Sequence, residues 1–379
     1  MRPVLLAMLL CACDVAGPSF SSYDGATTDG VLARSNLDAR VGALESLERR
    51  GSMHPGVFAE LTEARLSRAS FFGIHGDLDR ARAARVDEGS ADALALAARV
   101  AGAVHELDEA EALLDRATAL DGDERALARS TIDLAHERNL QDVLRLRQRR
   151  ASERPTFERL AELAPVYAAL GRFDEADETY VRALRSYRDV SPFVVAAIQF
   201  QRGVMWAERA DRPELALPLY RDAVARLPGY VVANVHLAEL ESPDAAIERL
   251  RRLAEETEDP EPASVLAELL MARDPEAAAR YRDRATERYD SLLARFPDAF
   301  ADHAAEHFMG PGADPERAWR LASSQLEARR TDRHLQLSID AALATGRASE
   351  ACALSREARS RTSVNLRERA REVLLDCPG

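Results

Sequence analysis

The 379-residue sequence contains no lysine, and each of its 51 basic residues is an arginine. Aromatic residues make up only 6% of the chain, and β-branched residues and hairpin turns are scarce. This scarcity excludes a protein built mainly from strands. The formal net charge is −13. Because an acidic chain repels phosphate backbones, we expect no nucleic-acid partner.

The sequence also lacks a Walker loop, a Rossmann fingerprint and a nucleophile elbow, so it predicts no nucleotide cofactor and no serine-hydrolase site. What it has in abundance is Ala, Leu, Arg and Glu, all good helix formers. With 46% hydrophobic residues the chain can bury a core. We therefore expect an all-α protein that needs no cofactor.

The N-terminus begins with a charged residue and a short apolar run, Val4 to Leu10, followed by Cys11 and Cys13. The run is too short to span a bilayer, which takes about 20 residues, and it fits a secretory signal. The stretch LCAC resembles the lipobox of bacterial lipoproteins, and that resemblance implies cleavage before Cys13 and its lipidation. The polar residues 14–30 that follow read as a flexible tether. The alternative is an uncleaved apolar tail.

Small residues recur along the rest of the chain at a nearly constant spacing. The positions in register with Ala176 are Ala81, Ala110, Val143, Ala216, Ala246, Ala278, Ala318 and Ala351. The average step from the first to the last is about 34 residues, and the two steps that end at Ala216 and Ala318 each hold an insertion. Two antiparallel helices approach closely only where both carry small side chains, so the pattern predicts stacked helical pairs.

Around Gly171 the spacing of large and small residues resembles the tetratricopeptide repeat, with Leu160, Leu163, Ala164, Tyr167, Gly171, Ala176, Tyr180 and Ala183 at its signature positions. The resemblance implies a right-handed superhelical solenoid of eight to nine helix pairs. The predicted organisation is a signal peptide (1–12), a lipidated Cys with its tether (13–30), a repeat array (31–361) and a capping helix (362–379). Trp206 and Trp319 are predicted to pack within the repeats.

The tetratricopeptide resemblance also implies a concave groove that holds a protein or peptide partner and is lined by the first helix of each pair. By family register the groove residues are Ile198, Gln201, Met205, Glu208, Arg209, Val232, Val235 and Glu239. We expect a non-enzymatic scaffold in the bacterial cell envelope, held at the periplasmic side or the outer membrane by its lipid alone and active in envelope assembly.

One stretch, DHAAEHFMG, suggests a function other than that of a scaffold. His303, Glu306 and His307 match the H-x-x-E-H pattern of inverted zinc peptidases, and the two histidines lie on one face of a helix. Such a site needs a third ligand, for which Glu368 and Glu372 are candidates only by elimination. We expect packing or solvated residues here, with a zinc metallopeptidase as the alternative function.

Cys352 and Cys377 are the only cysteines after the N-terminal segment. They flank a predicted helical turn at nearly equal distances, which places them level on two antiparallel helices. In an oxidising compartment they form a disulfide if their side chains point toward each other. The alternative is that each is a small buried hydrophobe.

Overall fold

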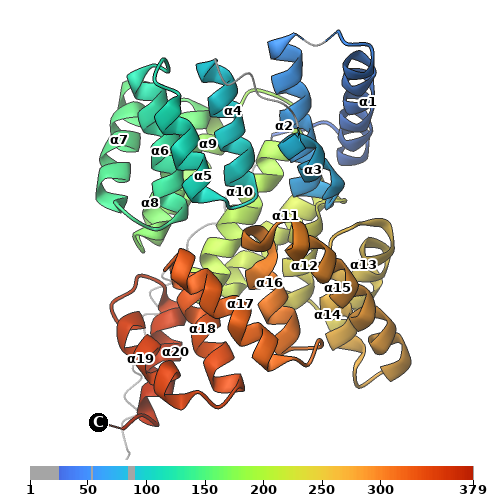
Figure 1. Ribbon diagram of the computed structural model, residues 1–379, viewed down its shortest axis with the longest axis vertical. Helices are drawn as coiled ribbons and strands as arrows, with labels where there is room; N and C mark the ends of the chain where they lie inside the picture. The colour runs from blue at the N-terminus through green and yellow to red at the C-terminus, as the bar shows by residue number, and fades with distance from the viewer. Residues whose placement is uncertain (1–24, 53, 84–89, 379) are drawn as a thin grey trace, which may run out of the picture.

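The computed structural model describes residues 25–52, 54–83 and 90–378, which consist of helices and the short segments that connect them (Figure 1). Those residues form twenty α-helices and one π-helical turn, and they include no strand. The first half comprises α1 (Gly30–Arg49), α2 (Pro55–Phe72), α3 (Gly76–Ala83), α4 (Ala91–Ala103), α5 (Leu107–Arg116), α6 (Gly122–Ala135), α7 (Leu140–Glu153), α8 (Phe157–Ala169), α9 (Phe173–Ser186) and α10 (Pro192–Val204). The second half comprises η1 (Met205–Arg209), α11 (Pro213–Arg226), α12 (Val231–Leu240), α13 (Pro243–Glu256), α14 (Glu261–Leu270), α15 (Pro275–Arg295), α16 (Pro297–Met309), α17 (Pro315–Ala328), α18 (Asp332–Ala344), α19 (Ala348–Ala358) and α20 (Val364–Leu375).

Helices α2 to α19 associate as nine consecutive antiparallel pairs, each formed by an even-numbered first helix and the odd-numbered second helix that follows. The nine positions in register with Ala176 all fall on second helices, and all of them are buried. Their small side chains let each second helix lie close against its first helix. The predicted all-α solenoid of stacked pairs is confirmed.

The pair formed by α8 and α9 shows how the sequence specifies the unit. Ala164 on α8, and Ala176 and Ala183 on α9, are fully buried. Gly171 follows α8 with a φ of +71°, a left-handed conformation that glycine adopts at little cost. Asp174 lies in the first turn of α9, where the helix dipole favours an acidic side chain.

The two predicted insertions take different forms. Before Ala216 the extra residues follow α10 as the π-helical turn η1. Before Ala318 they lengthen α15 to 21 residues. The first helix of the fifth pair therefore ends in a π-helical turn, a form that is rare and mostly confined to single turns.

The early pairs touch much later pairs along a line that we call the seam. His75 Nε2, just before α3, lies 3.3 Å from Asp259 Oδ2, before α14. The Gly76 amide donates to Glu258 Oε2 at 2.8 Å. Glu137, between α6 and α7, accepts from Arg209 Nη1 at 2.7 Å. Figure 1 shows α2 and α3 beside α12, α15 and α16.

Apolar packing also crosses the seam. Ala69 and Leu78 from the first pair, with Val104 after α4, share one core cluster with Leu292 of α15 and Phe296. The hydrogen bonds of the seam join residues that are 72 to 184 positions apart in the sequence, and the superhelix is closed against itself.

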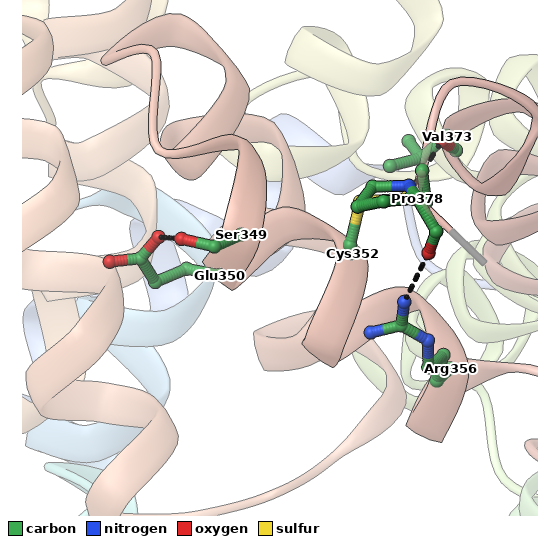
Figure 2. Close-up of a disulfide and its surroundings, with 7 residues drawn as sticks. Ser349, Glu350, Cys352, Arg356, Val373 and Pro378 are labelled. Atoms are coloured by element: carbon green, nitrogen blue, oxygen red, sulfur yellow. Dashed lines mark hydrogen bonds between the residues drawn. A yellow bond between two sulfur atoms is a disulfide. The ribbon is translucent and has the colours of Figure 1, made fainter.

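Helix α20 covers the C-terminal end of the array and packs on α18, α19 and η1. Its buried residues are Leu366, Ala370 and Val373. Cys352 on α19 and Cys377, which follows α20, form a disulfide with their Cα atoms 5.9 Å apart (Figure 2). The bridge joins the end of the chain to the last pair.

The predicted signal peptide, Cys13 and the tether up to residue 24 lie outside the described residues. Residues 25–29 lead into α1, where the Asp29 side chain accepts from the amides of Val31 and Leu32. Within the described ranges, no helix is both long and apolar enough to cross a membrane.

Candidate functional site: a charged central cavity

A cavity of about 760 Å³ lies on the inner side of the C-terminal half of the superhelix. Its walls come mainly from η1 and from the first helices α12, α14, α16 and α18, and Ser363, Asn365 and Leu366 close one end. The lining side chains include seven carboxylates and two arginines. The first helices thus present their inner faces to one acidic hollow.

Four of the eight predicted groove residues line this cavity: Glu208 and Arg209 from η1, and Val235 and Glu239 from α12. Arg209 does not extend freely into it, because its guanidinium lies between Glu137 and Asp332, at 2.7 and 3.4 Å. Arg209 therefore ties the cavity wall to the seam.

The other four predicted residues do not line the cavity. Ile198 and Met205 are 4% and 2% exposed and belong to core clusters, so their assignment to the groove is corrected. Val232 packs partly against the cluster around Phe72. Gln201 is exposed and accepts from the Tyr180 hydroxyl at 3.3 Å. Ile198 and Met205 are apolar, and they fill the contacts of α10 and η1 with neighbouring helices instead.

His303, on α16, is the centre of an ionic network on one wall. Its Nδ1 lies 2.5 Å from Glu261 Oε1 of α14. Arg333 of α18 donates to Asp302 Oδ2 and to Glu306 Oε2, both at 3.0 Å. Burial alone would lower the pKa of His303, but Asp302 and Glu261 together raise it to about 10. At neutral pH the imidazole is therefore a cation held between carboxylates.

A second group of acidic side chains is less well neutralised. His236 Nδ1 lies 3.3 Å from Glu208 Oε1 and 3.6 Å from Glu239 Oε2. Burial, with the charge of Glu208 adding to it, raises the pKa of the Glu239 carboxyl. Glu268 of α14 is exposed and makes no ion pair with any residue that the structure describes. This part of the cavity has acceptors in excess of donors.

His307 lines the same cavity but is already engaged. It is 1% exposed, and its Nδ1 and Nε2 lie 2.8 and 2.9 Å from the hydroxyls of Ser264 and Thr286. Burial and the nearby Arg317 lower its pKa to about 4. Because His303 instead faces Glu261, the two histidines do not share a ligand position. The described ranges contain no cluster of three or more His, Cys, Asp or Glu side chains arranged to hold a metal ion.

The zinc hypothesis also required a third ligand from the C-terminal helix. Glu372 of α20 is 68% exposed and pairs with Arg369 of the same helix. Neither it nor Glu368 lines the cavity that contains His303 and His307. The motif DHAAEHFMG is thus part of an ion-pair wall, and its partners Glu261 and Arg333 were not recognisable from spacing along the chain.

A second cavity of about 930 Å³ lies between α2, α4 and α6. Most of its lining residues are Ala and Leu, with a few acidic side chains, such as Glu63 and Glu124, among them. It contains none of the predicted groove residues.

No protein-family model matches the sequence, and no curated protein matches it. Among solved structures, the chain is similar to the APC/C hetero-tetramer Cut9–Hcn1, with 11% identity, a TM-score of 0.47, and coverage of 89% of this chain and 67% of that one. It is similar to a tetratricopeptide repeat protein from Parabacteroides merdae, with 16% identity, a TM-score of 0.37, and coverage of 76% and 98%. It is also similar to yeast Tom70, with 13% identity, a TM-score of 0.35, and coverage of 91% and 92%.

Proposed function

We propose that this protein is a non-enzymatic scaffold that holds a segment of a partner protein in the central cavity. The observation that carries the proposal is the cavity itself, formed by the inner faces of successive first helices. Its volume of about 760 Å³ is in the range of sites that enclose several side chains of a ligand. Inner faces of stacked helices suit an extended or helical peptide segment.

Two kinds of lining group support a peptide ligand. Val204, Leu240 and Val265, which are partly exposed, offer apolar contact, and carboxylates offer hydrogen-bond acceptors in the same cavity. A peptide presents apolar side chains and polar groups alternately along its length, so it is able to satisfy both. The seam contacts keep the wall helices in place before a partner arrives, which reduces the ordering cost of binding.

The test is site-specific photo-crosslinking in cells that produce the protein. Benzoylphenylalanine in place of Val265, inside the cavity, is expected to crosslink to a discrete partner. The matched control replaces Arg252 of α13, which is 64% exposed and does not line the cavity. If both positions give the same products, or if position 265 gives none, the scaffold proposal is wrong.

We further propose that the scaffold is tethered to the bacterial cell envelope through a lipid on Cys13 and acts there in assembly. Support comes from the LCAC stretch and from the Cys352–Cys377 disulfide, because disulfides persist in oxidising compartments. Several acyl chains, at about 0.8 kcal/mol per buried methylene, would hold the protein firmly on the membrane. Mass analysis of the mature N-terminus should find a lipidated Cys13, and an intact Met1 would contradict this.

A further inference from the structure

Building on the proposed scaffold function, we infer that the partner segment bound in the central cavity presents an arginine or lysine side chain next to apolar residues. The basic side chain would lie against the carboxylates that include Glu239 and Glu268, and the apolar residues would contact Leu240 and Val265, which are partly exposed in the same cavity. The inference concerns the chemistry of the partner, which the helical-repeat fold does not specify.

The first reason is the balance of charge. The cationic groups of the wall are already neutralised, because His303 pairs with Glu261, and Arg333 pairs with Asp302 and Glu306. Of the remaining lining carboxylates, Asp332 and Asp340 pair with Arg209 and Arg369. Glu208 and Glu239 share the single imidazole of His236, and Glu268 makes no ion pair with a residue that the structure describes. Arg333 Nη1 approaches Glu208 only to 3.9 Å.

The second reason is the position of Glu239. Burial and the charges of Glu208, Glu261 and Glu306 raise its pKa, although the nearby His236 acts in the opposite direction. Bringing like charges together in a partly desolvated hollow costs free energy, and a cation placed among them removes that cost. An acidic segment would add to it, so the cavity selects against acidic partners.

The third reason is that apolar side chains lie next to the carboxylates in the cavity. Val204, Ala207, Leu240 and Val265, all partly exposed, lie among them in the same cavity. A small polyvalent cation would leave these side chains against water, whereas a peptide covers them. Guanidinium and ammonium groups carried on apolar stems fit such a surface.

The probe is a short fluorescein-labelled peptide that repeats Leu, Ala and Arg, compared by anisotropy with peptides that carry Gln or Glu in place of Arg. The Arg peptide should bind, and its affinity should fall as salt is raised. The Gln peptide should bind at least about tenfold more weakly, and the Glu peptide should not bind. Equal affinity of the Arg and Gln peptides would overturn the inference. So would displacement by spermine as effective as displacement by the unlabelled Arg peptide.

The decisive variant is Glu239→Gln with Glu268→Gln, which removes two charges with little change in shape. Its affinity for the Arg peptide should fall about tenfold, as expected for lost charge-assisted hydrogen bonds. The control Glu276→Gln with Glu372→Gln removes two charges at sites that are 90% and 68% exposed, and it should leave the affinity within about twofold. Equal losses in the two variants would mean that only net charge matters, and the inference would fail.

The same neutral variant separates this inference from the scaffold proposal. With benzoylphenylalanine at position 265, the Glu239→Gln, Glu268→Gln protein should lose the crosslink that the otherwise unaltered protein gives. A crosslink that persists in the neutral variant refutes the basic segment and leaves the scaffold function standing. A crosslink absent even without the two substitutions refutes the scaffold function itself.

Discussion

The disulfide between Cys352 and Cys377 should account for much of the stability of the C-terminal cap. The perturbation is Cys352→Ala with Cys377→Ala, which removes both thiols and leaves no unpaired one. The two cysteines are 25 residues apart. For a closed loop of that length the chain-entropy relation gives about 3.5 kcal/mol of stabilisation at 25 °C.

The double variant should nevertheless remain folded, because other contacts hold α20. Leu366 and Ala370 are buried, and the Ser363 amide donates to Asp332 Oδ2 at 2.9 Å. Next to the central cavity, Asn365 Nδ2 donates to the Ala207 carbonyl at 3.0 Å. The lost stability should therefore appear as local opening of α20 and the end of α19, not as unfolding of the whole array.

Native-state hydrogen exchange of α20 amides, measured with chemical denaturation, resolves this local opening. About 3.5 kcal/mol corresponds to exchange faster by up to roughly 300-fold in the double variant. Wild-type protein treated with reductant should match the variant and so controls for the alanines themselves. If α20 amides exchange within about twofold of the oxidised wild type, the bridge does not stabilise the cap and the reasoning is refuted.

Two further predictions concern the array and the ionic wall. A Cβ at Gly203 would overlap the Tyr220 ring, so Gly203→Ala should cost about 1–3 kcal/mol in denaturant unfolding. Gly102→Ala, where a Cβ meets nothing within 4 Å, is the control, and equal losses would contradict the packing argument. The raised pKa of His303, about 10, means that the folded protein keeps a proton that the unfolded chain loses above about pH 6.5. The free energy of unfolding should thus decline between about pH 6.5 and 10, and less steeply in His303→Gln; identical slopes would show that His303 is not held as a cation.

The helix pairs were predictable because each pair is specified by residues that are close together in the sequence. The spacing of Ala176 and its counterparts placed nine second helices, and Gly171 marked the end of α8. The two long steps located the insertions. They did not reveal that one insertion is the π turn η1 and the other a longer α15. Both insertions add residues to a helix, so both lengthen the spacing between successive small residues in the same way.

The cavity was predictable only in part. Of the residues that the tetratricopeptide register selected, Glu208, Arg209, Val235 and Glu239 line the cavity, whereas Ile198 and Met205 do not. Which face of a helix is inner depends on how each pair packs against the next, and the spacing of small residues does not specify that packing. The partners of His303 come from α14 and α18, so their proximity follows from the stacking of three pairs.

The seam has a consequence for the order in which the protein can be completed on the ribosome. Asp259, which contacts His75, is synthesised 184 residues after it. At roughly 5–20 residues per second, about 10–40 s pass between the two. During that interval we expect the apolar side chains of α2 and α3 that face α15 to stay uncovered, and protease sensitivity of ribosome-held chains measures this directly. The first pair is thus synthesised well before the residues that complete its packing.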